Sequence, residues 1–197
     1  MRILTFATAN AHKVEEIKSF FSDLPVIIQS LQDFPHLPEA PEPFNTFEEN
    51  ALNKARFLHP HSGELVIADD SGLEVDHLDG RPGVHSKRYS SEGTSEANNS
   101  KLLLEMADTE NRSARFRCVL AIYDGTNHHF IHGTCEGQIG KDVTGSQGFG
   151  YDPIFIPSDM NGLSMAQISM QEKNSISHRG RALQGLKQWL LDHPNGF

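Results

Sequence analysis

Apolar residues along the chain gather either in short, mostly apolar segments or at helical spacings, and the two patterns alternate. The mostly apolar segments at residues 2–7, 26–29 and 65–68 are typical of buried strands. Between them, residues 10–22 and 47–58 place apolar side chains three or four positions apart, which indicates amphipathic helices. The sequence therefore predicts strands at the mostly apolar segments and helices at the spaced ones.

Local signals set the boundaries of these elements. Thr46-Phe47-Glu48-Glu49 matches the capping box that begins many helices, so a helix is expected from residue 47. Four prolines fall between residues 33 and 45, which predicts an extended loop there. The apolar run at 65–68 stops abruptly at Asp69-Asp70-Ser71-Gly72, so we expect that strand to end at Ala68, with strand character returning at 73–75.

A hairpin is predicted in the second half of the chain. Residues 114–123 and 127–136 resemble strands, and Asp124-Gly125 between them is a strong signal for a two-residue turn. That register would place the thiols of Cys118 and Cys135 roughly 13 Å apart, too far for a disulfide. We therefore expect reduced cysteines and a cytoplasmic location.

The remaining segments complete the expected fold. Helices are predicted over 95–106 and 177–191, and a glycine-containing loop over 145–152. Early alternation of strands and helices, followed by a hairpin, is typical of an α/β fold with a mixed sheet.

Length and composition limit the class of protein. The chain has 197 residues, which suits one domain of roughly 100–200 residues. Its longest apolar run, residues 118–123, is far shorter than the ~20 residues that cross a bilayer. The N-terminal residues lack the pattern of a signal peptide. We expect a single domain over residues 1–197, soluble and without a membrane partner.

Acidic residues are concentrated in one part of the chain. The formal net charge is −9, and the segment from Asp33 to Gly80 alone holds eleven acidic and two basic residues. Residues 171–197 are instead rich in lysine and arginine. An acidic middle and a basic tail suit a divalent cation and phosphates, although a solvated acidic surface explains the charge equally well. Binding to nucleic acid is not expected, because that requires a basic stripe.

The first candidate site is Thr8-Ala9-Asn10-Ala11-His12-Lys13, between a predicted strand and helix. Free N–H groups at the start of a helix bind anions, and Lys13 adds a positive charge one turn later. Thr8 and Asn10 offer further donors. An ordinary strand–helix junction capped by Asn10 is the alternative, since the glycines of known phosphate loops are missing.

The second candidate is the pair Asp69 and Asp70. Adjacent carboxylates after a buried strand are costly unless a cation compensates them, and Mg²⁺ uses one or two carboxylates together with substrate phosphates. Neighbouring strand residues point to opposite faces, so we expect one aspartate to face the site and the other to cap backbone amides. The alternative is a plain Asp-Asp-Ser-Gly turn.

Two further candidates lie near the C-terminus. In Gly148-Phe149-Gly150-Tyr151-Asp152-Pro153, the glycines allow close backbone approach and an aromatic ring could stack on a nucleobase. Lys173 and Ser177-His178-Arg179 offer donors for an oxygen-rich ligand. The alternatives are a glycine-rich turn with core aromatics and a solvated basic helix end.

Occurring together and in this order, these segments resemble the HAM1/RdgB-type inosine triphosphate pyrophosphatase family. The matching pieces span almost the whole chain: Thr8-x-Asn10-x-x-Lys13, Thr46 to Ala51, Ala68 to Leu73, Pro82-Gly83, Arg88-Tyr89-Ser90, Gly148 to Pro153, Glu172-Lys173 and Ser177-His178-Arg179.

The resemblance implies an activity and a fold. The activity is hydrolysis of non-standard purine nucleoside triphosphates (ITP, dITP, XTP) to the monophosphate and pyrophosphate, with Mg²⁺ as cofactor. The fold is elongated and two-lobed, with a central mixed sheet flanked by helices and a cleft between the lobes. A homodimer is also implied.

The resemblance also implies residue roles. Asp70 would be the general base and a metal ligand, and Glu42 a second metal ligand. The substrate contacts would be Thr8, Asn10 and Lys13 for the triphosphate, Ser71, and, for base and phosphate recognition, Phe149, Gly150, Tyr151, Asp152, Lys173, His178 and Arg179.

Two positions depart from the family pattern. Ala9 stands where the family usually has glycine, and alanine would be strained there if the backbone needed a positive φ. Pro41-Glu42-Pro43-Phe44 stands where the family often has Glu-Glu-Thr-Gly, so only one carboxylate is kept. The alternatives are therefore a Maf-like or other nucleotide phosphohydrolase with a different base preference, and a nucleotide-binding sensor without catalysis.

Overall fold

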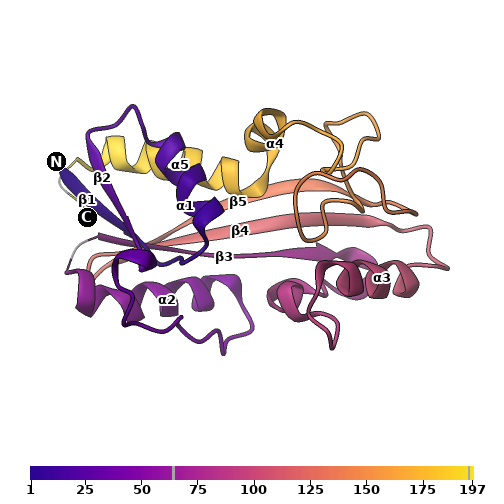
Figure 1. The fold of residues 1–197 in the computed structure, drawn as a ribbon, viewed down its shortest axis with the longest axis horizontal. Helices are drawn as coiled ribbons and strands as arrows, with labels where there is room; N and C mark the ends of the chain where they lie inside the picture. The colour runs from indigo at the N-terminus through magenta and orange to yellow at the C-terminus, as the bar shows by residue number, and fades with distance from the viewer. Residues whose placement is uncertain (64, 195) are drawn as a thin grey trace. The chain divides into compact units, whose positions relative to one another are not determined.

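The structure is a computed structural model that describes residues 1–63, 65–194 and 196–197. A six-stranded sheet runs in the order β2-β1-β3-β4-β5-β6 (Figure 1). β1 is parallel to both β2 and β3, whereas β6 is antiparallel to β5, so the predicted mixed sheet is confirmed. The strands are β1 (Arg2–Phe6), β2 (Val26–Ser30), β3 (Leu65–Val75), β4 (Ser113–Tyr123), β5 (His128–Ile139) and β6 (Phe155–Pro157).

Five α-helices and three short 3₁₀ helices accompany the described strands. The α-helices are α1 (Ala11–Phe20), α2 (Phe47–Ser62), α3 (Ser95–Glu105), α4 (Met170–Ile176) and α5 (His178–Asp192). The 3₁₀ helices are η1 (Leu31–Asp33), η2 (Asp76–Leu78) and η3 (Gly83–Arg88).

The chain divides into two compact units. Unit 1 comprises Met1–Asp70, Val119–His132 and Ala182–Phe197. Within it, α1 and α2 cover opposite faces of the sheet (Figure 1). The α2 face is buried against β3 through a cluster that contains Leu31, Ala55, Leu58, Val66 and Ala68. Burial of this apolar face is the main source of the helix's stability, and it fixes α2 beside β3.

Unit 2 comprises Ser71–Cys118 and Gly133–Arg181. Its core joins α3 to strand residues and to the segment after the predicted loop, through Leu73, Val75, Leu102, Met106, Phe116, Tyr151, Ile154 and Phe155, among others. The loop at 148–152 is therefore anchored in a core through Tyr151 rather than standing free on the surface.

Helix boundaries follow the predicted caps. Asn10 accepts the Lys13 N–H at 3.3 Å and caps α1. Thr46 accepts the Glu49 N–H and caps α2, which ends at Gly63 in the left-handed region with φ of 65°. Both helix starts are thus confirmed at the residues that the sequence indicates.

Two predicted boundaries are wrong. β3 does not end at Ala68 but continues through Asp69 and Asp70 to Val75, because partners on other elements compensate both carboxylates. Four residues, not two, connect β4 to β5, because the Asp124 carboxylate accepts the N–H groups of Thr126 and Asn127. The predicted helix at 177–191 is confirmed as α5 with a shift of one residue, whereas the separate helix α4 before it was not predicted.

Other expectations of the sequence are met. Cys118 and Cys135 are buried and free. In the described part of the chain, every helix is too short or too polar to cross a membrane. The proline-containing segment after η1 has no regular structure up to α2.

Candidate active site

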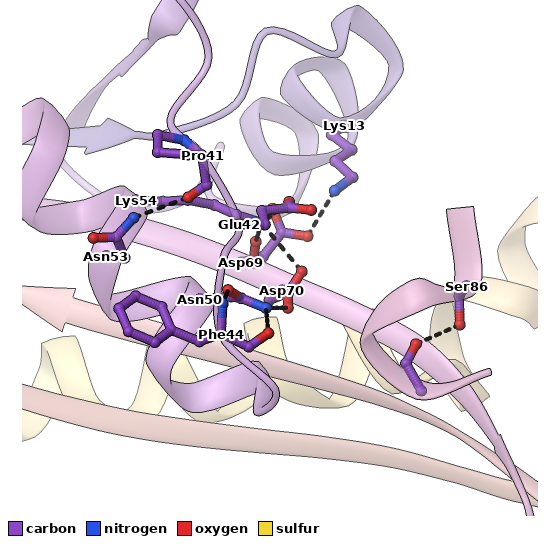
Figure 2. Close-up of polar contacts among 11 residues, drawn as sticks. Lys13, Pro41, Glu42, Phe44, Asn50, Asn53, Lys54, Asp69, Asp70 and Ser86 are labelled. Atoms are coloured by element: carbon purple, nitrogen blue, oxygen red, sulfur yellow. Dashed lines mark hydrogen bonds and ion pairs between the residues drawn. The ribbon is translucent and has the colours of Figure 1, made fainter. Parts of the chain in front are cut away.

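The turn between β1 and α1 brings three predicted residues of unit 1 together. Thr8 is buried, with 9% of its surface exposed, and its hydroxyl accepts the Asn10 N–H at 3.3 Å. Lys13, in the first turn of α1, extends its ammonium to Asp69 at 2.7 Å (Figure 2). Among the described non-glycine residues only Asp79 and Asn161 have positive φ, so Ala9 is accommodated without the strain that its departure from the family pattern raised.

Asp69 and Asp70 serve opposite faces of β3, as the alternation of strand residues predicts. Asp69 pairs with Lys13 of α1. Asp70 is 7% exposed and contacts α2, where Asn50 donates to its Oδ2 at 3.2 Å. The two carboxylates therefore face different helices, each with a cation beside it.

Lys54 of α2 holds the acidic residues of unit 1 together. Its ammonium lies 2.6 Å from Glu42 Oε1 and 3.1 Å from Asp70 Oδ1, and it donates to the backbone carbonyl of Asp69 at 2.9 Å. The lysine side chain is only 12% exposed. In a poorly solvated place, one ammonium with three oxygen acceptors satisfies its three donors and offsets part of the repulsion between the Glu42 and Asp70 carboxylates.

Glu42 reaches this cluster because α2 holds the chain on both sides of it. Asn53 donates to the carbonyl of Pro41 at 2.9 Å. Asn50, fully buried, accepts the N–H of Phe44 at 3.0 Å and donates to its carbonyl at 3.1 Å (Figure 2). We refer to these contacts of Asn50 and Asn53 as the asparagine clamp. The clamp fixes an otherwise irregular segment so that Glu42 lies beside Lys54.

Burial and charge shift the proton affinities of this cluster. Burial raises the pKa of the Asp70 carboxyl above its usual range and the Glu42 charge adds to this, while Lys54 and Asn50 oppose it. For Lys54, burial lowers the pKa, but the charges of Asp70, Asp69 and Glu42 outweigh it, so that its pKa is raised. Lys54 is therefore charged at neutral pH, and Asp70 binds a proton more readily than an exposed aspartate.

The donor set at Glu42 and Asp70 fits a hard divalent cation. Oxygens of both carboxylates converge on one cationic group, the Lys54 ammonium, at 2.6 and 3.1 Å. Oxygen ligands of this kind suit Mg²⁺, which commonly takes one or two carboxylates and completes its shell with phosphates and water. Among the described residues no set of three or more His, Cys, Asp and Glu side chains forms a metal site. Phosphate oxygens and water are the ligands with which Mg²⁺ commonly completes such a shell.

In unit 2, the loop at 148–152 is closed by two charged residues. Asp152, 4% exposed, accepts the Phe149 N–H at 2.7 Å and the Lys173 ammonium at 2.5 Å through the same oxygen, Oδ2. The ammonium also lies 4.7 Å from the centre of the Phe149 ring, which is 64% exposed. An exposed aromatic ring held over a fixed cation offers a flat surface for a ligand to stack on.

The other predicted residues of unit 2 are placed individually. The Tyr151 hydroxyl donates to the Ser86 carbonyl at 2.8 Å, so this side chain is a structural anchor rather than an exposed contact. His178, at the start of α5, stacks on Phe116 with ring centres 4.8 Å apart. Arg179 is 9% exposed, and the Ser71 hydroxyl is buried without a hydrogen-bond partner among the described residues.

Sequence reasoning missed Lys54, Asn50 and Asn53. Their spacing on a helix was visible, because positions three and four apart share a face, and Asn50 and Lys54 are four apart. No local pattern indicates that this face meets Asp70 and the segment around Glu42, since those contacts join residues up to 20 positions apart.

Comparison with known proteins identifies the family of the chain. The sequence model described as the Ham1 family matches residues 4–189. The chain belongs to the Ham1 family. The predicted resemblance is thus confirmed, and the match includes both the β1–α1 junction of unit 1 and the loop of unit 2.

Curated relatives of this Ham1 chain carry an enzyme name. A protein from Geobacter sulfurreducens named dITP/XTP pyrophosphatase is 47% identical over 194 residues, which cover 96% of this chain and 97% of that protein. A protein of the same name from Thermoanaerobacter sp. is 46% identical, with 97% of each chain covered.

Solved structures agree with the fold. The structure of a Ham1 protein from Coxiella burnetii has a TM-score of 0.91 at 37% identity, and covers 98% of this chain and 100% of its own. The crystal structure from Mycobacterium abscessus described as a nucleoside-triphosphatase / dITP/XTP pyrophosphatase has a TM-score of 0.79 at 39% identity, with 93% and 98% covered. The Ham1 fold, a mixed α/β sheet flanked by helices, is therefore the fold of this chain.

Proposed function

We propose that this chain is a nucleoside triphosphate pyrophosphatase that hydrolyses ITP, dITP and XTP to the monophosphate and pyrophosphate, with Mg²⁺ as cofactor. The observation that carries the proposal is the pair Glu42 and Asp70, held at one buried cation in a chain 47% identical to a dITP/XTP pyrophosphatase. Keeping two carboxylates side by side is costly for the fold, and a reaction that uses them accounts for that cost.

The start of α1 supports a role in holding the triphosphate. Thr8, Asn10 and Lys13 lie in one turn, where the helix presents its positive end. Lys13 is paired with Asp69, at 2.7 Å. This ion pair holds the lysine in place before the substrate binds, and an incoming phosphate would then compete with Asp69 for the ammonium.

Asp70 is the proposed general base. Its raised pKa makes it a better proton acceptor than an ordinary aspartate, and a base works best when its pKa approaches the working pH. Glu42 and Asp70 are the proposed ligands of Mg²⁺, which when bound neutralises negative charge on the phosphates. Lys54 keeps the two carboxylates in place and adds positive charge to the same region.

Recognition of the base is assigned to Phe149, Gly150, Tyr151 and Asp152, with Lys173, His178 and Arg179, and Ser71 is a further proposed substrate contact. Donors aimed at a 6-oxo group would lose their partner if the purine carried an amino group there. Such a mismatch is worth up to ~10⁴–10⁵ in selectivity. The loop supports this assignment because its backbone is fixed by Asp152 and Lys173 before any ligand is present.

A single assay tests this proposal. The purified chain is incubated with ITP, XTP, dITP, ATP or GTP and Mg²⁺, and pyrophosphate and orthophosphate are measured separately. Pyrophosphate release from the non-standard nucleotides, in large excess over ATP and GTP, is expected. Orthophosphate release or equal rates on ATP would favour the Maf-like alternative, and binding without turnover would favour a sensor; either result contradicts the proposal.

We further propose, from the family, that the chain acts as a homodimer in the cytoplasm and that its two units are the lobes of a single catalytic domain. Light scattering of the purified protein, which reports the mass of the particle, tests the dimer.

A further inference from the structure

Asn99, a residue of α3 in unit 2, contacts the proposed base-recognition loop. Its side-chain NH₂ donates to the carbonyl of Gly150 at 3.1 Å. Asn99 is 5% exposed, and its other polar atom, Oδ1, is buried with no hydrogen-bond partner among the described residues. A buried acceptor without a partner costs about 1–3 kcal/mol, and the hydrogen bond from the NH₂ group to Gly150 is what the asparagine provides in return.

The contacted carbonyl occupies a particular place in the loop. The Asp152 N–H donates to the Phe149 carbonyl at 3.2 Å, which makes residues 149–152 a β-turn. Gly150 has φ of 62°, and Tyr151 is not among the described residues with positive φ. Gly150 is the first central residue of this turn, so its carbonyl belongs to the central peptide of the turn.

Fixing this carbonyl also fixes a donor. A trans peptide is planar, so the carbonyl of Gly150 and the N–H of Tyr151 point in opposite directions. Within the part of the chain that the structure describes, that N–H donates no hydrogen bond to another residue. Tyr151 is 4% exposed, and a buried N–H without a partner inside the protein is unfavourable, so an acceptor on a ligand would satisfy it.

Further hydrogen bonds attach both α3 and the 149–152 turn to residues 86–90. The neighbouring residue Asn98 accepts the Ser90 N–H at 2.7 Å and donates to the Lys87 carbonyl at 3.2 Å. Tyr151 is itself anchored to the Ser86 carbonyl. α3 and the loop are therefore attached to the same stretch of chain, and the contact from Asn99 closes the connection between them.

We propose that Asn99 is a positioning residue for base discrimination: it holds the central peptide of the 149–152 turn so that the Tyr151 N–H is directed to the 6-oxo group of a purine. This inference rests on the proposed function, since it assigns the direction of a donor within the proposed base site.

Steady-state kinetics of Asn99→Leu with ITP and ATP test the inference, with Ser100→Ala, an exposed neighbour on α3, as the control. Removing one hydrogen bond of this kind is expected to raise KM for ITP about tenfold, with kcat little changed. The kinetics on ATP and the unfolding temperature should stay close to wild type. An equal loss on both nucleotides, or no loss on either, overturns the role of Asn99.

A second variant, Asn99→Asp, is measured at two pH values. A purely structural role of Asn99 would not make the discrimination between ITP and ATP depend on pH. At pH 8 its carboxylate faces the Gly150 carbonyl and repels it, so discrimination between ITP and ATP should fall. At pH 6 a protonated carboxyl, favoured by burial, donates to that carbonyl, and discrimination should recover towards wild type. If the ratio of kcat/KM for ITP to kcat/KM for ATP does not change with pH in this variant, the inference is contradicted.

The wild-type protein distinguishes a failure of the proposed function from a failure of the role of Asn99. If the wild type hydrolyses ITP and ATP equally well, both the proposed function and the role of Asn99 are overturned. A wild-type preference that persists unchanged in both Asn99 variants overturns the role of Asn99 alone.

Discussion

Lys54 illustrates at the level of one residue how a cation makes an acidic cluster possible. Its ammonium contacts Glu42, Asp70 and the Asp69 carbonyl within 3.1 Å. Without it, two carboxylates would stand together in a place with little water. The fold therefore supplies its own counter-charge to residues that the proposed reaction needs for other purposes.

Replacing Asp70 with asparagine tests the base assignment. Asparagine keeps the shape and an acceptor for Lys54 but cannot take up a proton, so kcat on ITP should fall at least ~100-fold while the unfolding temperature is maintained. Pyrophosphate release and thermal unfolding measure the two quantities. Glu39→Gln, at an exposed position, is the charge-matched control and should retain activity. An active Asp70→Asn variant contradicts the assignment.

Replacing Lys54 with methionine should destabilise the protein in a pH-dependent way. Removing one partner of a buried ion pair costs about 3 kcal/mol. The folded-state pKa of Asp70, already raised, would rise further without the opposing charge. When the pKa of a carboxyl group is higher in the folded than in the unfolded protein, the folded protein loses stability as the pH rises from the unfolded-state pKa through the folded-state pKa.

The loss in Lys54→Met, relative to wild type, should therefore be larger at pH 8 than at pH 4.5. Urea unfolding at both values measures it. A loss of stability independent of pH would show that Lys54 acts through packing alone.

At the scale of elements, the asparagine clamp and the 148–152 loop use the same device. In each, helix side chains bind the backbone of an irregular segment: Asn50 and Asn53 of α2 in unit 1, and Asn99 of α3 in unit 2. In unit 2, Lys173 of α4 adds a contact to the Asp152 carboxylate of the loop. Irregular segments supply site residues with the geometry they need, and helices supply the rigidity.

Gly148 tests how strictly the loop is packed. A Cβ at Gly148 would lie 2.1 Å from Asp152 Oδ2, the atom that binds Phe149 and Lys173, and φ there is 78°. Gly148→Ala should displace Asp152 and raise KM for ITP at least about tenfold, the equivalent of 1.4 kcal/mol. Gly162→Ala is the matched control, because φ is 87° there and nothing lies within 4 Å. Equal effects of the two variants on KM would show that backbone strain, and not the contact with Asp152, is responsible.

How far the sequence predicts each element depends on the range of the contacts that define it. The caps at Asn10 and Thr46 were predictable because they join residues three positions apart. The continuation of β3 past Ala68 was not, because it depends on Lys13 and Lys54, which are distant in sequence and compensate the two aspartates. The proposed role of Glu42 as a metal ligand is implied by the family resemblance alone, and the placement of this residue depends on long-range contacts that no local pattern encodes.

At the scale of the whole molecule, metal dependence should separate activity from stability. The carboxylates of the proposed metal site already have the Lys54 ammonium beside them, so the fold does not need another cation. Treatment with EDTA should abolish pyrophosphate release from ITP, while the unfolding temperature shifts by less than about 2 °C. Added Mg²⁺ should restore activity. A large fall in the unfolding temperature would mean that a metal is part of the folded structure.

The asparagine clamp also determines where the chain can tolerate a change in length. Asn53 and Asn50 hold Pro41 and Phe44, so the number of residues between these two anchors is fixed by the spacing of the asparagines along α2. An extra residue after Pro38, in the exposed stretch upstream, would only enlarge a surface loop. The same insertion after Glu42 would shift the carboxylate or release an anchor. Deletions and insertions that persist in functional variants of this protein should therefore gather before Pro41 and be absent between Pro41 and Phe44.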